Sequence, residues 1–339
     1  MSFATIDHDA PGRPGAASRP ATVPRRGAGW AGLARVTWRQ HRLALAAVAV
    51  LFGVLAAVLV AQGLGMHHVY SSFGLSFSHP PSGARAVSLA ETFENEYLGY
   101  GMYVPRFLMF LPLFVGAFLG GPLIAHELES GTFRFAWTQS AGRTRLTIAK
   151  LAILGLALTA MALAFSALFS WWYRPFRQLL GPLPEVEGVV FAARVLLGFT
   201  LGAFAGAVLR RTVPAIAVAM VLWFAVVLPT ALFLRPHFEA PLTAPVSMTS
   251  KFSTEWTLSQ WWVDPRGNRL GSAAYNALVR SLPTSDPQSW LAAHHYVLWE
   301  TFQPASRFWT FQAIEAGGLV ALCLALAGAT VWWVRRKAS

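Results

Sequence analysis

Long uninterrupted apolar runs constrain this 339-residue chain more than any other feature of its sequence. Apolar residues make up 55% of the chain and charged residues only 12%, a balance typical of proteins embedded in lipid. A helix needs about 20 apolar residues to cross the hydrocarbon core, because each residue advances the helix by about 1.5 Å. We therefore expect an all-α polytopic membrane protein with six transmembrane helices, at 43–61, 107–125, 151–172, 189–209, 213–234 and 308–334.

The distribution of positive charge predicts how these helices are oriented. Lys and Arg near short loops resist translocation and therefore accumulate in the cytosol. With the N-terminus inside, the cytosolic pieces carry sixteen Lys or Arg and four acidic residues, whereas the external pieces carry ten of each. We therefore expect both termini in the cytoplasm, with the whole formal charge of +12 on that side. This pattern indicates contact with anionic membrane lipids and argues against a nucleic-acid partner.

Two segments precede the first predicted span. Residues 1–28 are rich in Pro, Gly, Ala and Arg without apolar periodicity, which predicts a disordered cytosolic tail. Residues 29–42 carry aromatic and basic side chains at helical spacing, which predicts an amphipathic helix lying at the membrane interface. The alternative is a simple positive stop before the span. The side chains assigned to this interfacial helix are Trp30, Arg35, Trp38, Arg39 and Arg42.

The spans divide the rest of the chain into membrane, cytosolic and external parts. The first five spans lie within 43–234, which includes an external loop at 62–106 and a cytosolic segment at 126–150. An aromatic-rich external region occupies 235–307, and 308–339 holds the sixth span and a basic cytosolic tail.

The external region contains a helix-start signal. Asp286 followed by Pro287 is a favourable N-cap and first-turn pair. Trp290, His294 and later residues then follow at helical spacing, which predicts a helix over 285–301. We expect short helices of this kind to form an external helical cap.

Glycines at every fourth position mark close helix packing within the spans. Gly198, Gly202 and Gly206 follow this spacing in the fourth span, as do Gly116 and Gly120 in the second. Small residues at this spacing let neighbouring helices approach closely. The sequence alone is compatible with packing inside one subunit and with packing between two subunits.

Motifs for nucleotide hydrolysis and metal binding are absent from the sequence. None of the three lysines belongs to the glycine-rich loop that cradles nucleotide phosphates. His126 and Glu127 begin like a zinc-protease helix, but Ser130 stands where the second histidine would be needed. The single cysteine, Cys323, lies inside the last span. We expect no metal, no cofactor and no catalytic residue on this chain.

Two opposite charges lie inside the predicted spans. Arg194 is in the fourth span and Glu315 is in the sixth, each about two turns from the external end. Intramembrane charges usually face the bundle interior or a wet pathway. The pair therefore predicts either a structural ion pair or a substrate contact, and proton coupling is a further possibility.

Four motifs carry a resemblance to a known family. They are WRQHR at 38–42, HELESGTFR at 126–134, WTQS at 137–140 with Arg143 and Lys150 beyond it, and QPASRFW at 303–309 leading into Glu315. Together they resemble the permease subunits of bacterial ABC-2 type exporters. The similarity spans nearly the whole chain after the tail, and the Glu-x-Gly-Thr-x-Arg portion is its most specific part.

This resemblance implies a half transporter in the bacterial plasma membrane. It would pair with a second copy or a homologous permease and with two copies of an ABC ATPase, on which ATP and Mg would bind. The compound exported would be amphipathic or hydrophobic, such as an antibiotic, a lipid or a peptide-like molecule.

The resemblance also implies that segment 126–150 docks the ATPase and acts as a coupling helix. An ordinary amphipathic loop adhering to lipid headgroups is the alternative. The residues assigned to docking are Glu127, Glu129, Gly131, Thr132, Arg134, Trp137, Gln139 and Arg143.

Two other functional classes stay open on the sequence. One is a membrane enzyme that acts on a lipid-linked substrate and uses Glu91, Glu94, Asp264 or His294 as acid or base. The other is a sensor or scaffold that holds an ATPase without moving a substrate.

Overall fold

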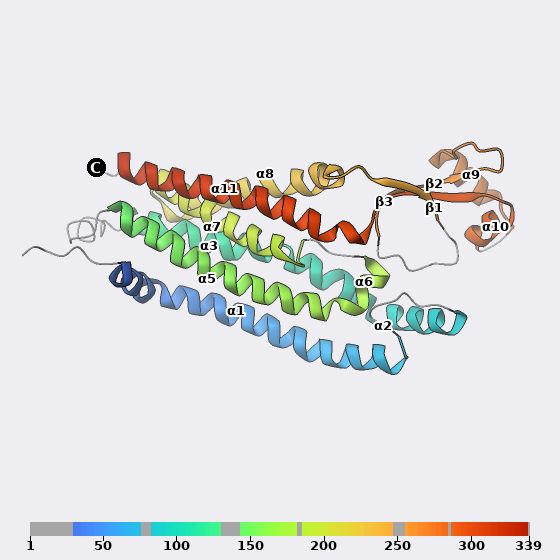
Figure 1. Cartoon of the computed structure of the whole chain (residues 1–339), viewed down its shortest axis with the longest axis horizontal. Coiled ribbons are helices and arrows are strands. Elements are labelled where there is room, and N and C mark those ends of the chain that lie inside the picture. The colour runs from blue at the N-terminus through green and yellow to red at the C-terminus, as the bar shows by residue number, and fades with distance from the viewer. Residues whose placement is uncertain are drawn as a thin grey trace, which may run out of the picture.

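The computed structural model describes residues 30–75, 83–129, 143–181, 185–246, 255–283 and 286–337. Long helices run side by side along the longest axis of the molecule, and a small β-sheet projects from one end (Figure 1). The α-helices are α1 (Trp30–Ser72), α2 (Ala84–Leu108), α3 (Leu111–Glu129), α5 (Arg143–Trp172), α6 (Arg174–Leu180), α7 (Val189–Leu209), α8 (Thr212–Pro229), α9 (Ser272–Ser281), α10 (Pro287–Ala293) and α11 (Phe308–Lys337). The strands are β1 (Leu242–Pro245), β2 (Trp256–Val263) and β3 (Val297–Gln303), and the short π- and 3₁₀-turns are η1 (Thr230–Leu234), η2 (Arg235–His237) and η3 (Ala305–Arg307).

Six helical segments of the described residues are long and apolar enough to cross a membrane. They are Trp30–Ser72, Asn95–Glu129, Thr144–Trp172, Val189–Leu209, Thr212–His237 and Ala305–Arg336. Each predicted span falls within one of these segments, so the six-helix, predominantly α-helical membrane fold is confirmed. The start of α1 and the end of α11 lie at the end of the bundle opposite the sheet (Figure 1).

Helix α7 is the central helix of the bundle. It contacts α3, α5, α8 and α11, and most of its residues are buried. A helix that is apolar all round is stable only when other helices or lipid cover every face. Helix α7 is apolar all round, with Arg194 as its only charged residue, and its neighbours cover it.

Glycines form the contact between α3 and α7. A Cβ atom added at Gly120 would lie 2.1 Å from the carbonyl oxygen of Phe199, and one added at Gly116 would lie 2.7 Å from the Cα of Gly198. At Gly202 and Gly206 the added atom would meet the backbone of the α3 segment at 2.5 and 2.7 Å. These distances leave no room for a side chain. The glycine rows therefore serve packing within one subunit.

The predicted interfacial helix and the first span form one continuous helix, α1. Leu33 and Thr37 are buried, with Leu33 packed against Leu146 of α5. The aromatic and basic side chains Trp30, Arg35, Trp38, Arg39 and Arg42 are exposed. The Arg145 guanidinium lies 5.2 Å from the centre of the Trp30 ring. A position at the membrane interface remains a prediction.

The predicted helix over 285–301 is wrong beyond Ala293. Asp286 caps α10 as expected, because its Oδ1 accepts a hydrogen bond from the Ser289 N–H at 3.2 Å. His295 then takes a left-handed conformation with φ of 63°, which ends the helix. Beyond it, β3 pairs antiparallel with β1 on one side and β2 on the other. The alternating β-branched and aromatic side chains of β3 favour this pairing over a helix.

The sheet is anchored to the ends of the last two spans. The Gln303 amide donates hydrogen bonds to the carbonyl oxygens of Pro236 and Glu239, at 3.2 and 2.8 Å. Arg307, just before α11, forms an ion pair with Glu239 at 2.6 Å. In its described residues, region 235–307 contains a three-stranded sheet and two short α-helices, and the predicted cap of short helices did not include this sheet.

The Gly120→Ala substitution tests the α3–α7 contact. Its methyl group has no space against the Phe199 backbone, so we expect a loss of about 1–3 kcal/mol in the free energy of unfolding. The matched control is Gly317→Ala in α11, where an added Cβ meets nothing within 4 Å. Thermal unfolding in detergent measures both variants. Equal melting temperatures for the two would contradict the close packing.

Candidate functional site

Arg194 and Glu315 meet inside the helical bundle. Nη2 of Arg194, on α7, donates to Oε1 of Glu315, on α11, at 2.8 Å. The two side chains are 1% and 2% exposed. The sequence left open whether these charges pair or contact a substrate, and in the structure they form an ion pair.

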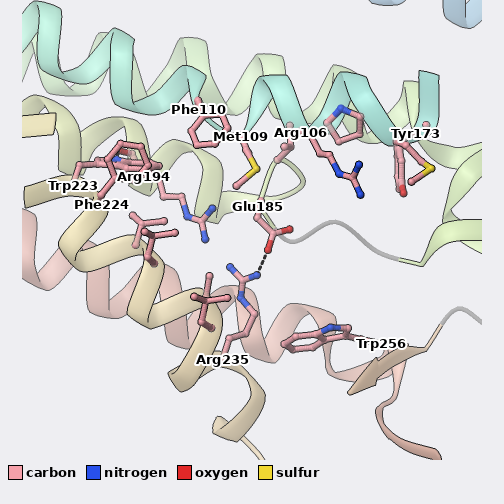
Figure 2. A pocket seen from close by; sticks show the side chains of 18 residues that line it. Arg106, Met109, Phe110, Tyr173, Glu185, Arg194, Trp223, Phe224, Arg235 and Trp256 are labelled. Carbon is pink, nitrogen blue, oxygen red and sulfur yellow. Dashed lines mark hydrogen bonds and ion pairs between the residues drawn. The ribbon is translucent and has the colours of Figure 1, made fainter. Parts of the chain in front are cut away.

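A second arginine binds the same carboxylate from a third helix. Arg235, directly after α8 and η1, donates from Nε to Oε2 of Glu315 at 2.8 Å. Its Nη2 lies 2.7 Å from the same oxygen, and its Nη1 binds Glu185, as the dashed line in Figure 2 shows. Arg194, Glu315, Arg235 and Glu185 thus form a chain of alternating charges, which we call the charge network. Buried charges persist only when paired in this manner, because each costs several kcal/mol to remove from water.

Sequence reasoning missed Arg235 and Glu185. Both were assigned to external segments, since Arg235 follows the fifth apolar run and Glu185 precedes the fourth. The π-turn η1 extends α8 and brings Arg235 into the bundle, where its side chain is 2% exposed. The available signal was an acidic residue just before the fourth apolar run and a basic residue just after the fifth, at the same predicted end of two neighbouring spans.

Glu185 lies in the segment before α7, and its side chain is 24% exposed. Burial alone would raise the pKa of its carboxyl group. The positive charges of Arg235 and Arg194, together with the hydrogen bond from Arg235, outweigh burial and hold that pKa below its ordinary value. Glu185 is therefore negatively charged at neutral pH.

Neighbouring polar contacts position the start of α7. The Gln312 side chain of α11 accepts a hydrogen bond from the Val190 N–H at 2.9 Å and donates one to the Glu187 carbonyl at 3.0 Å. The Glu187 carboxylate forms an ion pair with Arg177 of α6. On the other side, the indole N–H of Trp223 donates to the Arg194 carbonyl at 3.1 Å. These bonds hold α6, α8 and α11 around the charge network.

A pocket of about 560 Å³ lies beside the charge network (Figure 2). Its wall comes from the α2–α3 junction, the segment before α7, α7 itself, α8 with η1, and β2. Most of the lining is apolar, and the charged side chains are few. The lining residues include Met102, Arg106, Met109, Phe110, Tyr173, Glu185, Arg194, Trp223, Phe224, Leu228, Leu232, Arg235 and Trp256.

This arrangement has the properties of a binding site for a small molecule. Ligand pockets of roughly 300–1,000 Å³ typically combine apolar walls with a few fixed polar groups. Within the described residues, no cluster of three or more His, Cys, Asp or Glu side chains could hold a metal ion. The geometry thus supports binding of an amphipathic molecule, with the charge network as its polar wall. We call this cavity the network pocket.

The opposite end of the bundle holds the described part of the predicted docking segment. Glu127, near the end of α3, forms an ion pair with Lys150 of α5. Glu129 accepts hydrogen bonds from the backbone N–H and the hydroxyl of Thr212, at 3.1 and 2.9 Å. Both predicted docking carboxylates therefore bind within the chain and tie α3 to its neighbours. Arg143 is the first residue of α5, and the remaining docking residues lie outside the described part of the chain: Gly131, Thr132, Arg134, Trp137 and Gln139.

Comparison with known proteins identifies a family. The family model described as "ABC-2 membrane transporter related" matches residues 33–235, well over half of the chain. This range includes five of the six predicted spans, the predicted docking segment and both network arginines. No curated protein and no solved structure matches the chain.

The Glu315→Gln substitution tests the charge network. It leaves Arg194 and Arg235 buried without their shared countercharge, so we expect a loss of about 3 kcal/mol in the free energy of unfolding. Glu96→Gln, at an exposed position of α2, is the control and is expected to change stability by less than about 0.5 kcal/mol. Thermal unfolding in detergent checks both. Similar melting temperatures for the two variants would argue against a buried network.

The pH dependence of stability tests the charge on Glu185. A carboxyl group whose pKa is lower in the folded than in the unfolded state stabilises the folded protein at pH values above the unfolded pKa of 4.5. This contribution is lost as the pH falls through the folded pKa. We expect Glu185→Gln to melt below the wild type at pH 7. The difference in melting temperature between the two proteins should disappear below pH 4.5, in melting curves recorded between pH 3 and 7. A difference that is independent of pH would contradict this assignment.

Proposed function

The chain belongs to the ABC-2 membrane transporter-related family, and on this premise we propose that it is the permease subunit of an ATP-driven exporter. The complex would contain two permeases and two copies of a separate ABC ATPase, which binds ATP and Mg. The compound moved would be amphipathic or hydrophobic, such as an antibiotic, a lipid or a peptide-like molecule. Movement would follow alternating access, driven by closure of the ATPase pair.

One observation carries this proposal: the same two helices reach both the docking segment and the network pocket. Helix α3 begins beside Phe110 in the pocket wall and ends at Glu129, about 28 Å away for 19 residues. Helix α8 begins at Thr212, which Glu129 binds, and lines the pocket at Leu228 near its far end. A displacement of the docking segment would therefore act on two walls of the pocket together.

The close contact between α3 and α7 makes such transmission effective. Their backbones touch along the glycine rows, so a displacement of α3 presses directly on α7. Arg194 of α7 in turn is bound to α11 through Glu315. ATPase closure would then move the helices of the pocket wall together. Such a movement is required to change the side of the membrane from which the pocket is accessible. Ligand binding biases such a switch only through different affinities for its two states.

The geometry does not favour the enzyme alternative. The Asp264 carboxylate accepts hydrogen bonds from the backbone N–H groups of Arg266 and Asn268, at 2.9 and 2.7 Å, and so stabilises its own turn. The His294 ring stacks on Trp290 with 3.6 Å between ring centres. Asp264 and His294 therefore have local structural roles, and Glu91 lies on α2, a different element from either of them.

Co-purification with the ATPase tests the proposed function. We expect native mass spectrometry of the tagged chain, co-expressed with its ATPase, to show two permeases with two ATPases. The Arg134→Glu, Trp137→Ala double substitution should abolish this complex, because it alters charge and shape in the docking segment. Arg280→Glu on α9, at the sheet end of the molecule, is the control and should retain the complex.

A solitary chain in every sample would contradict the permease assignment. A complex that also forms with the double variant would show that the ATPase docks on another part of the chain than 126–150. A complex whose ATP hydrolysis never responds to any added amphiphile would favour the non-transporting scaffold.

A further inference from the structure

We propose that the network pocket recognises amphiphiles that carry a single anionic group, such as a phosphate or carboxylate, on an apolar body. This inference rests on the proposed function and deepens it by naming the chemical class of the substrate. Three properties of the pocket support this inference: its charge balance, a guanidinium at its edge that is paired with none of the described residues, and its apolar wall.

The charge balance of the pocket favours an anion. Arginines 106, 194 and 235 all line it, and Glu185 is the acid that lines it with them (Figure 2). Glu315 lies behind this wall and neutralises a second positive charge. Three guanidinium groups against two carboxylates leave one positive charge in excess. A single anionic group on the ligand would balance it.

Arg106 supplies the unmatched charge. It lies in the last turn of α2, its side chain is exposed, and the described part of the chain provides no hydrogen bond or ion pair for it. The other two arginines are at most 2% exposed and already bind carboxylates. Arg106 can therefore turn toward a ligand without breaking a hydrogen bond or ion pair to another described residue. Arginine is well suited to this role, because its planar donors match phosphate and carboxylate oxygens.

The apolar wall provides space for the body of the ligand. The centres of the Phe110 and Phe224 rings lie 6.1 Å apart with their planes tilted by 55°, and Trp223 meets Phe224 edge to face at 5.5 Å. Met102 and Met109 also line the cavity, and methionine side chains adapt to varied shapes. A volume of about 560 Å³ accommodates a molecule of ordinary drug size.

A cationic amphiphile fits this site poorly. Its charge would approach three arginines, and Glu185 already binds Arg235. A neutral amphiphile would gain apolar contacts and leave Arg106 unsatisfied. Charge complementarity of this kind selects between ligands more than it raises affinity overall.

Binding of matched probes to the isolated full chain tests the proposal. The probes are dodecyl phosphate, dodecylamine and dodecanol, which share one alkyl chain and differ in head charge. Native mass spectrometry in an uncharged detergent counts the molecules retained by the chain, without the ATPase. We expect one dodecyl phosphate to be retained in preference to the other two.

Two variants locate this binding. Arg106→Gln should weaken dodecyl phosphate binding by roughly three- to tenfold and leave dodecanol unchanged. Arg85→Gln, which removes another exposed arginine from the same helix, is the matched control and should have no effect. Ala231→Phe, which fills the cavity, should weaken all three probes.

Competition with phosphatidylglycerol separates two sources of the anionic group. Displacement of dodecyl phosphate by this two-chain lipid identifies a membrane lipid as the ligand, and failure to displace it identifies a smaller solute; both outcomes support the anionic class. Equal retention of the three head groups, or an unchanged affinity in Arg106→Gln, overturns the proposal. Because the assay omits the ATPase, such a result leaves the permease assignment intact, whereas loss of the ATPase complex alone leaves the binding site intact.

Discussion

The Glu315 carboxylate binds two buried arginines, and the arrangement of the helices around it depends on this contact. Arg194 belongs to α7 and Arg235 follows α8, while Glu315 belongs to α11. Separation of any of these helices at this depth would leave a charge without a partner in an apolar environment, at a cost of several kcal/mol. The same network keeps Glu185 ionised and forms the polar wall of the pocket. One set of contacts thus stabilises the bundle and forms one wall of the network pocket.

A second constraint is the backbone contact between α3 and α7. Glycines along both helices bring their axes close enough that a methyl group at Gly120 would collide with Phe199. This contact joins the central helix α7 to α3, which ends at Glu129. The hydrogen bond from Thr212 to Glu129 links the start of α8 to the end of α3. Close packing of this kind transmits strain from one helix to the next, because it leaves little space to absorb it.

Sequence patterns predicted the elements that depend on local chemistry. The six spans follow from apolar length, and the α10 N-cap follows from Asp286 and Pro287. The helix over 285–301 was predicted too long, because helical spacing in a short segment does not reveal that β3 has partners in β1 and β2. Arg235 was assigned outside the membrane for a similar reason, since a π-turn that extends a helix leaves no clear mark in composition.

By itself, the sequence determined that this is a six-helix membrane protein, that Arg194 and Glu315 lie at similar depth, and that certain helix faces are made of glycine. These properties depend on side-chain length, polarity and spacing along one element. Only the tertiary structure decided that the glycine rows meet each other within one chain, that Glu315 serves two arginines, and that a pocket opens beside them. Such facts depend on which distant segments become neighbours, and the free energy of packing decides this over the whole bundle.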